Sequence, residues 1–452
     1  MEPALMVIGL NHLTAPLAMR ERFCIADNRS YEVLHKLHSA EGIDEVMVVS
    51  TCCRTEFWLW AAEPTLAANS LLQFLGSAHA LKLTEWEHFY RLLDDSALSH
   101  IFRVTSGVDS LVLGNLYITA RVRAAWEQAQ AVGTAGPFLN QVTERALAVC
   151  QRVHEETGFR EVEECMSSLA LELGAQLFGS LEGRRILLVG AEMNGHLSAR
   201  GLKDRGVKSV VVIDQVPARA KELAAKFGGT SALLEDRWNA MLRADIVISH
   251  TGCPHVILTR EEAERIALER NRVPLMVVDL GVPRDVDPEV RKVDGMVLYN
   301  MDALERMETK TSAERKAAVT DSEKIIAAEV QIFRGRLRAE RTLPTVVALR
   351  NRLEELCRQE LDSFITERGP FTREQNQSLH AITTQLIQTI ASSLVRELKE
   401  FPEKAEQERM TAAVTRLFHL DSLKTDTPQT APAGTRSRKS KTEKAQERAI
   451  AM

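Results

Sequence analysis

The sequence lacks long apolar runs. No stretch of its 452 residues approaches the roughly 18 consecutive apolar residues that a membrane-spanning helix needs. Residues 1–5 carry no basic segment of the kind that opens a secretory signal. The seven cysteines include no CxxC pair, and His35 and His38 have no third ligand at a suitable spacing, so no metal site is predicted. These absences predict a reduced, cytoplasmic protein that does not enter a membrane.

A large excess of one charge is also absent. The net charge of −5 argues against a protein that binds phosphate backbones over its whole surface. Residues from Lys424 onward nevertheless carry +4, and the rest of the chain carries −9. Because this end has almost no apolar residues, we expect 423–452 to be a disordered basic tail. A solvated tail is the favoured interpretation, and a weak contact with RNA is the alternative.

Three folded parts precede the tail. Residues 1–160 mix short apolar strands, expected at 5–9, 45–49 and 57–60, with helices, which is typical of an α+β domain. Residues 161–310 alternate helices with apolar runs at 185–189, 210–213, 246–248 and 276–278. This pattern predicts a doubly wound, Rossmann-like parallel sheet that is buried on both faces.

Residues 311–422 contain little glycine, and their apolar residues recur every three or four positions. This spacing predicts an all-helical domain, in which Thr372 and Gln375 form a capping box at the start of one helix. The apolar stripes of these helices either face a partner subunit or pack within a single chain.

One motif in the first domain carries reactive chemistry. The segment STCCR at 50–54 follows directly on an expected strand, where a loop can present a side chain to a ligand. The thiolate form of Cys52 would be a nucleophile, and Arg54 could favour that form or bind a carboxylate. Taken alone, the motif also fits a buried structural cysteine. His12 and His100 are candidate polar partners or ordinary satisfied histidines.

Five segments in collinear order resemble the glutamyl-tRNA reductase family. They are GLNHLTAP at 9–16 followed by RE at 20–21, STCCRTE at 50–56, HIFRVTSGVDSLVLG at 100–114, DLGVPRDVDP at 279–288, and LPT at 343–345 followed by LR at 349–350. The resemblance implies a catalytic, tRNA-binding domain at 1–160, an NADP(H)-binding domain at 161–310 and a dimerisation domain at 311–422. It also implies a V-shaped homodimer with a long spinal helix, which corresponds to the helical stretch near 140–175.

The resemblance further implies a reaction. The family's cysteine, matched by Cys52, attacks the ester of glutamyl-tRNA(Glu), forms a thioester and releases the tRNA. Hydride from NADPH then gives glutamate-1-semialdehyde, the precursor of 5-aminolevulinate, porphyrins and haem. Thr51, Arg54 and Ser110 match positions that bind the glutamate moiety, and His100 matches a residue important for activity. The family also suggests a partnership with the aminomutase that consumes the aldehyde.

Several substrate-facing positions depart from the family pattern. Cys53 replaces an asparagine, and it is either neutral or a second thiol able to intercept the thioester or to oxidise with Cys52. Asn115 replaces a glutamate, and Tyr117 and Arg121 replace glutamines. These replacements put recognition of the glutamyl group in question, although Arg121 can still pair with a carboxylate.

The cofactor-binding positions depart as well. The expected turn comprises Gly190, Ala191, Glu192, Met193, Asn194 and Gly195. Glu192 takes the place of the second glycine, where its charge repels a pyrophosphate unless the chain shifts by one residue. Asp214-Gln215 replaces the family's Asn-Arg pair at the end of the second strand. An acidic residue there accepts a hydrogen bond from a ribose 2′-hydroxyl and repels a 2′-phosphate, unless it only caps the strand. We therefore expect the family's NADPH preference to shift towards NADH, or both cofactors to bind poorly.

Three functions remain open at this point. The leading hypothesis is an active glutamyl-tRNA reductase, because the cysteine, arginine and histidine positions are all present. The second is a catalytically impaired paralogue that keeps the fold and the dimer and has a regulatory or tRNA-binding role. The third is a dehydrogenase for another small acyl or carbonyl substrate.

Overall fold

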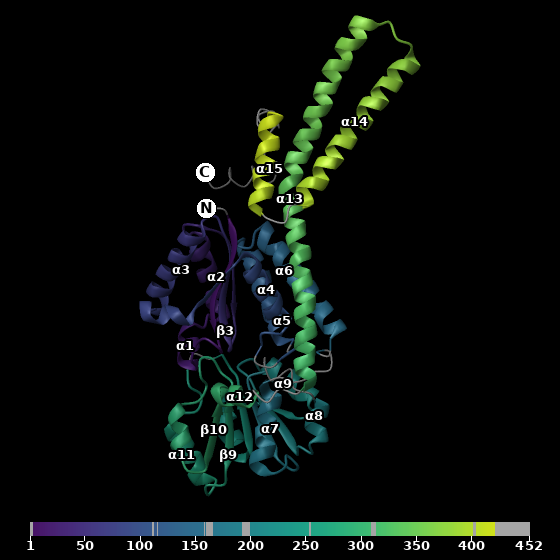
Figure 1. Cartoon of the computed structure of the whole chain (residues 1–452). Helices are drawn as coiled ribbons and strands as arrows, with labels where there is room; N and C mark the ends of the chain where they lie inside the picture. The colour runs from purple at the N-terminus through teal and green to yellow at the C-terminus, as the bar shows by residue number, and fades with distance from the viewer. Residues whose placement is uncertain are drawn as a thin grey trace, which may run out of the picture. The chain divides into compact units, whose positions relative to one another are not determined.

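The computed structural model describes residues 3–110, 113–114, 116–157, 159, 166–191, 199–252, 255–308, 313–400 and 404–420 (Figure 1). The chain divides into two compact units, residues 1–331 and 332–452. The predicted tail at 423–452 lies outside the described residues. Within the described ranges, no helix is both long enough and apolar enough to cross a membrane.

The first unit begins with an antiparallel sheet in the order β2-β3-β1-β4. Its strands are β1 (Ala4–Asn11), β2 (Ile43–Ser50), β3 (Arg54–Ala61) and β4 (Tyr90–Leu93). Its helices are α1 (Leu17–Phe23), α2 (Asp27–His38), α3 (Pro64–His79), α4 (Asp94–Thr105), α5 (Tyr117–Val132) and α6 (Pro137–Glu156). Helices α2 and α5 pack against β2, and α4 packs against β1. The predicted α+β fold is confirmed, and β4 is an additional strand.

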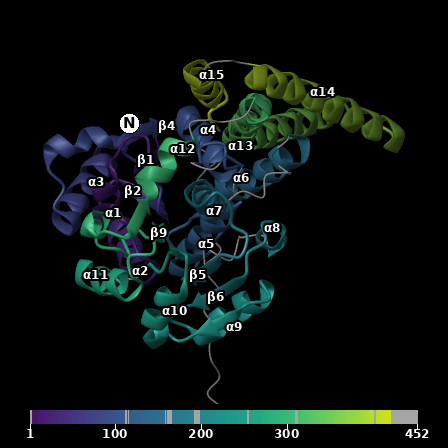
Figure 2. The same cartoon turned by 90° about the horizontal axis from the view of Figure 1, so that it is seen from below.

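The same unit contains a six-stranded parallel sheet in the order β10-β9-β8-β5-β6-β7. Its strands are β5 (Arg185–Val189), β6 (Ser209–Ile213), β7 (Thr230–Ala232), β8 (Ile246–Ser249), β9 (Leu275–Asp279) and β10 (Met296–Asn300). Its helices are α7 (Met166–Phe178), α8 (Ala199–Asp204), α9 (Pro217–Lys226), α10 (Arg237–Arg243) and α11 (Arg260–Glu269). Helix α9 packs against β6 and α10 against β5 (Figure 2).

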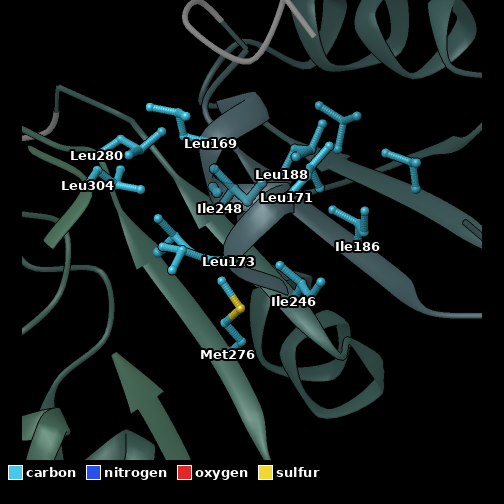
Figure 3. Close-up of a cluster of buried hydrophobic side chains, with 14 of the residues drawn as sticks. Leu169, Leu171, Leu173, Ile186, Leu188, Ile246, Ile248, Met276, Leu280 and Leu304 are labelled. Atoms are coloured by element: carbon cyan, nitrogen blue, oxygen red, sulfur yellow. The ribbon is translucent and has the colours of Figure 1, made fainter. Parts of the chain in front are cut away.

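Both faces of the parallel sheet are buried. Ile186 and Leu188 of β5 point into one apolar cluster, whereas Leu187 and Val189 point into another. Figure 3 shows the first cluster, in which leucines of α7 lie against side chains of β5, β8 and β9. Because successive residues of a strand face opposite sides, continuous apolar runs are what such a sheet requires. The predicted doubly wound sheet is confirmed.

The remaining helices are α12 (Met301–Glu308), α13 (Ala313–Arg368), α14 (Arg373–Glu400) and α15 (Lys404–Leu417). The predicted capping box is present, since Thr372 accepts from the Gln375 N–H at 3.3 Å and Gln375 accepts from the Thr372 N–H at 2.9 Å. In the second unit, Leu349 of α13 packs with Val414 of α15. The predicted helical domain is confirmed.

The long helix does not lie where the sequence placed it. The expected spinal helix near 140–175 is wrong, because α6 ends at Glu156 and Thr157 adopts an extended conformation. The Thr157 hydroxyl donates to the Val153 carbonyl at 2.7 Å, which helps to end the helix at this point. The long helix is instead α13, which has 56 residues.

Candidate active site

Cys52 lies in the tight turn between β2 and β3. The Thr51 N–H donates to the Arg54 carbonyl at 2.8 Å and closes the turn. The Thr51 hydroxyl accepts from the backbone N–H groups of Cys53 and Arg54, each at 3.2 Å. The structure therefore places Thr51 as the residue that fixes the turn and holds Cys52 in position.

The thiol of Cys52 is buried against the second sheet. It belongs to the same buried apolar cluster as Leu280 and Val282, which lie in the loop after β9. Its Sγ lies 3.7 Å from the Sγ of Cys53. Cys52 is therefore located where the hairpin meets the carboxyl edge of the parallel sheet, the edge at which α/β proteins bind ligands.

Two effects keep this thiol neutral. The hydrogen bond to Cys53 and then burial raise the pKa of Cys52 well above its ordinary value, and nearby Arg20 offsets this only in part. Arg20 is itself buried and donates to the Cys52 carbonyl at 3.1 Å. The cation beside the thiol is therefore Arg20, and not Arg54 as the motif predicts.

Arg54 instead joins a buried polar network. Its Nη1 donates to Glu56 Oε1 at 2.6 Å, and its Nη2 donates to Asp109 Oδ2 at 3.1 Å. The side chain is only 1 % exposed. Burial lowers the pKa of Arg54, but its interactions with Glu56, Tyr90 and Asp109 together outweigh burial, so the pKa is raised. Both terminal nitrogens of Arg54 are thus engaged by carboxylates of the protein itself.

Glu56 is the centre of this network. Besides Arg54, it accepts hydrogen bonds from Trp58 Nε1 at 2.8 Å and from the Tyr90 hydroxyl at 2.7 Å, and His100 Nε2 lies 3.1 Å from it. Burial raises the pKa of Glu56, but His100 and Arg54 outweigh burial, so the pKa lies well below the ordinary range. Glu56 is therefore a charged carboxylate with complete hydrogen bonding inside the domain.

The other predicted substrate residues lie near Cys52 or near the carboxylate network of Glu56. Tyr117 packs against the same apolar cluster as Cys52. Ser110 directly follows Asp109 in a turn, where its N–H donates to the Gly107 carbonyl at 3.3 Å. Arg121 donates to the Ser50 carbonyl at 3.3 Å and lines a cavity of about 380 Å³ beside β2. Asn115 lies outside the described residues.

An ion pair joins the two sheets of the first unit near Cys52. The backbone N–H of Arg284 donates to Glu21 Oε1 at 3.0 Å, and its guanidinium donates to both carboxylate oxygens at 2.8 Å. Cys24, close to Glu21 in the chain, donates from Sγ to the Val282 carbonyl at 3.6 Å. These contacts hold the loop after β9 against α1 and so keep the hairpin thiol at the edge of the sheet.

The expected cofactor turn begins with a glycine that the backbone requires. Gly190 has a φ of +88°, and a Cβ added to it would lie 1.7 Å from the His250 carbonyl oxygen. Asp214 follows β6 and accepts from the N–H groups of Ala191 and Val216, each at 2.8 Å. Asp214 therefore caps the strand end and holds the start of the turn. Glu192, Met193, Asn194 and Gly195 lie outside the described residues.

Several residues of this site were not predicted from the sequence. Glu56 and Asp109 lie inside two of the recognised motifs, and Arg20 follows the first of them, but none of the three had an assigned role. Tyr90 carried no signal of its own. Burial of a charged residue depends on partners from other elements, so spacing alone does not reveal it. Among the described residues, no three side chains of the histidine, cysteine, aspartate and glutamate types are grouped so that they could hold a metal ion.

Comparison with known families and proteins accounts for most of the chain. Residues 8–157 match the family "Glutamyl-tRNAGlu reductase, N-terminal domain", 172–307 match "Shikimate / quinate 5-dehydrogenase", and 321–420 match "Glutamyl-tRNAGlu reductase, dimerisation domain". A solved glutamyl-tRNA reductase from Methanopyrus kandleri is 24% identical, with a TM-score of 0.45, and the match covers 92% of this chain and 99% of that one.

Two curated relatives match at higher identity. A glutamyl-tRNA reductase from Desulforudis audaxviator is 37% identical over 420 residues, which is 92% of this chain and 93% of the relative. Glutamyl-tRNA reductase 2 from Koribacter versatilis is 34% identical over 433 residues, or 94% of this chain and 99% of the relative. Likeness at this level over nearly the whole length shows that the chain belongs to the glutamyl-tRNA reductase family.

Proposed function

We propose that this chain is an oxidoreductase that converts glutamyl-tRNA(Glu) to glutamate-1-semialdehyde through a thioester on Cys52. The product is the precursor of 5-aminolevulinate and hence of porphyrins and haem. The observation that carries the proposal is the position of Cys52, a buried thiol between the β2–β3 turn and the carboxyl edge of a dehydrogenase-like sheet. The names of the full-length relatives support the substrate.

The first step is acyl transfer. The sulfur of Cys52 attacks the ester carbonyl carbon, the bond to the terminal ribose oxygen of the tRNA breaks, and that oxygen takes up a proton. Because the pKa of Cys52 is raised, the thiol loses its proton as the attack proceeds rather than beforehand. The resulting thioester holds the glutamyl group at the edge of the sheet and is more easily reduced than an ester.

The residues at the ends of β5 and β6 fit a nicotinamide dinucleotide. The Gly190 turn and Asp214 occupy the places where dinucleotide-binding sheets hold the pyrophosphate and the ribose. Asp214 already accepts two backbone hydrogen bonds, but a carboxylate offers about four lone-pair sites, so a ribose hydroxyl can also donate to it. When bound, the reduced nicotinamide supplies the hydride that converts the thioester to the aldehyde.

Asp214 leads us to propose NADH as the better of the two cofactors. Its charge would lie close to a 2′-phosphate and repel it, whereas an unphosphorylated ribose can hydrogen-bond to it. Titration of the protein with NADH and NADPH, followed by nicotinamide fluorescence, tests this. We expect tighter binding of NADH in the wild type and a smaller difference in Asp214→Asn. Equal affinities in the wild type would contradict the proposal.

We assign Arg54 and His100 as positioning residues that act through Glu56. Both terminal nitrogens of Arg54 bond to carboxylates of the chain, so it holds the turn that carries Asp109 and Ser110 beside the hairpin. The family role of Thr51, Arg54 and Ser110 in binding glutamate stays a prediction for this chain, as does that of Tyr117 and Arg121.

The second unit supports a homodimer. Residues 321–420 match a family described as a dimerisation domain. On α14, Ile382, Leu386 and Ile390 form an apolar stripe, and each is between 45% and 57% exposed in the single chain. Covering such a stripe with a second copy removes apolar surface from water. We therefore propose that α14 contributes to the dimer contact.

The catalytically impaired paralogue is the second candidate. It is favoured by the raised pKa of Cys52 and by the internal engagement of Arg54, which together leave the thiol neutral and the guanidinium occupied. Such a protein would bind glutamyl-tRNA(Glu) and dimerise without reducing the glutamyl group to the aldehyde.

A single-turnover assay separates the two candidates. The protein is mixed with glutamate-labelled tRNA(Glu) and a reduced nicotinamide cofactor, and any aldehyde is trapped. Cys52→Ser is measured alongside Cys357→Ser, a control in α13 of the second unit. Aldehyde from the wild type and from Cys357→Ser, with none from Cys52→Ser, is the expected result. Absence of aldehyde from folded, dimeric wild-type protein would favour the paralogue.

A further inference from the structure

His12 lies at the edge of the candidate active site. Strand β1 ends at Asn11, which pairs with Arg54 of β3, so His12 emerges beside the turn that carries Cys52. The Asn11 side chain accepts from the N–H groups of Leu13 at 3.0 Å and Thr14 at 3.2 Å. This Asx turn fixes the backbone around His12 and therefore the position of its Cα and Cβ atoms.

One ring nitrogen of His12 is buried without a partner. Its Nδ1 is shielded from solvent and has no hydrogen-bond partner in the part of the chain that the structure describes. The large majority of buried side-chain polar atoms do have a partner, and leaving one unpaired costs about 1–3 kcal/mol. A polar atom left in this state beside a nucleophile is therefore a candidate contact for a bound substrate.

The surroundings of His12 keep its ring neutral. Burial is the largest cause, and the positive charges of Arg54 and Arg20 add to it, while Asp109 acts in the opposite direction. Together they lower the pKa of His12 from 6.5 to about 4. A neutral imidazole carries one N–H, so at neutral pH it can donate a hydrogen bond without carrying a charge. The neighbouring arginines also make a developing negative charge more favourable here.

We propose that His12 donates from Nδ1 to the carbonyl oxygen of the glutamyl group during attack by Cys52. The inference rests on the proposed function. As the carbon–sulfur bond forms, the carbonyl electron pair moves onto oxygen, and it returns when the bond to the tRNA ribose oxygen breaks. His12 keeps its proton throughout and stabilises the oxygen while that oxygen is negative. The same hydrogen bond would act again when hydride adds to the thioester carbonyl.

The test measures the acylation step by itself. Without cofactor, labelled glutamyl-tRNA(Glu) is mixed with the protein and glutamate bound to Cys52 is followed by rapid quenching. His12→Ala should slow acylation by about 10²–10³-fold, the loss typical for one oxyanion donor, without weakening tRNA binding. His12→Gln keeps an N–H donor and should recover part of the rate. His79→Gln is the matched control, because His79 Nδ1 contacts the Arg22 carbonyl at 2.8 Å in another part of the domain.

A second measurement tests the role of His12 without the His12→Ala variant, in case that variant folds poorly. The carbonyl of the trapped thioester is labelled with ¹³C, and its infrared stretch is compared between the wild type and His12→Gln. We expect different frequencies in the folded wild type, in His12→Gln and in the denatured protein, because an imidazole, an amide and water weaken the carbonyl bond to different extents when they donate to it. The same frequency in the wild type, the variant and the denatured protein would overturn the assignment of His12.

The outcomes separate the two proposals. Acylation of the wild type together with an unchanged rate in His12→Ala overturns the role of His12 and leaves the thioester mechanism intact. No acylation of folded wild type overturns the thioester mechanism, and the role of His12 falls with it. Equal rate losses in His12→Ala and His79→Gln would show a general structural effect and would also overturn the assignment.

Discussion

The β2–β3 hairpin buries two reactive groups in opposite surroundings. Glu56 is charged, and its oxygens contact Arg54, Trp58, Tyr90 and His100. Cys52, four residues earlier, lies among apolar side chains with Cys53 as its polar neighbour. The carboxylate network is complete within the chain itself and acts as a scaffold. The thiol, in contrast, is kept neutral by its neighbour Cys53 and by burial.

Removing the charge at the centre of the scaffold should have the largest effect. Glu56→Gln leaves the buried guanidinium of Arg54 with Asp109 as its remaining carboxylate, and we expect a loss of about 3 kcal/mol in the free energy of unfolding. Urea denaturation followed by circular dichroism measures this loss. Glu32→Gln, which removes an exposed pair with Lys36, is the control and should leave stability unchanged. A loss of less than about 1 kcal/mol in Glu56→Gln would show that the network is not a scaffold.

The second prediction concerns the pH dependence of stability. The pKa of His12 is 6.5 in an unfolded chain and about 4 in the folded one, so between these values the unfolded state binds more protons. Stability should therefore fall as the pH drops from about 6.5 to about 4, by up to about 3 kcal/mol from this residue. The difference between wild type and His12→Gln in denaturation curves at pH 7 and pH 4 isolates this contribution. A constant difference would contradict the neutral state of the ring.

The contribution of Glu56 to stability should stay nearly constant in the pH range where that of His12 falls. The pKa of Glu56 is depressed, so the stability that it contributes is present above the ordinary pKa of a glutamate and is lost only as the pH falls through the depressed value. Down to about pH 4 the contribution of Glu56 should change little, while that of His12 changes steeply. If Glu56→Gln loses its effect already between pH 6 and pH 5, the carboxylate is not held charged by its partners.

Weakening the contact between the two sheets should have a smaller effect. Arg284→Ala removes the two guanidinium hydrogen bonds to Glu21 and keeps the one from the backbone N–H, and because the pair is partly exposed we expect a loss of about 1 kcal/mol in stability. A double-mutant cycle with Glu21→Ala measures the coupling. The acylation rate of Cys52 should fall more than stability suggests, because the pair positions the thiol. Equal changes in the acylation rate of Cys52 in Arg284→Ala and in the exposed control Arg272→Ala would show that the ion pair does not position the thiol.

The smallest energetic change is expected at Cys53. Its hydrogen bond is the largest cause of the raised pKa of Cys52, so Cys53→Ala should lower that pKa towards its ordinary value. The pH dependence of alkylation of Cys52, followed by mass spectrometry, measures the shift. Cys24→Ala is the matched control, because Cys24 is the last and smallest of the named influences on Cys52. An unchanged profile in Cys53→Ala would leave burial as the sole cause.

The sequence allowed the framework of the molecule to be predicted. Continuous apolar runs identified β5, β6, β8 and β9, because strands covered on both faces need apolar residues at every position. The Thr372–Gln375 capping box was readable because its partners are three residues apart. The spinal helix was misplaced because helical periodicity looks the same in α6 and α13, and the end of α6 depends on the conformation of Thr157.

The chemistry of the site was less accessible to sequence reasoning. Cys52 was found through its motif, but its neighbours were not, since they come from distant parts of the chain. Arg20 lies 32 residues before Cys52, and Tyr90 and His100 lie 34 and 44 residues after Glu56. In a sequence, Arg54 and Glu56 look like surface residues of a strand. Only the contacts that Tyr90 of β4 and His100 of α4 make with Glu56, together with the burial of both charged residues, show that these charges are buried and paired.

The close approach of the His250 carbonyl group to the backbone at Gly190 has a consequence for how relatives of this protein are classified. The carbonyl oxygen of His250 occupies the place where any other residue would carry its first side-chain atom. A descendant that had stopped using a dinucleotide would still have to keep this glycine in order to fold. Its presence in a genome survey therefore diagnoses the sheet and not the activity, and a search for inactive members should score Cys52 instead.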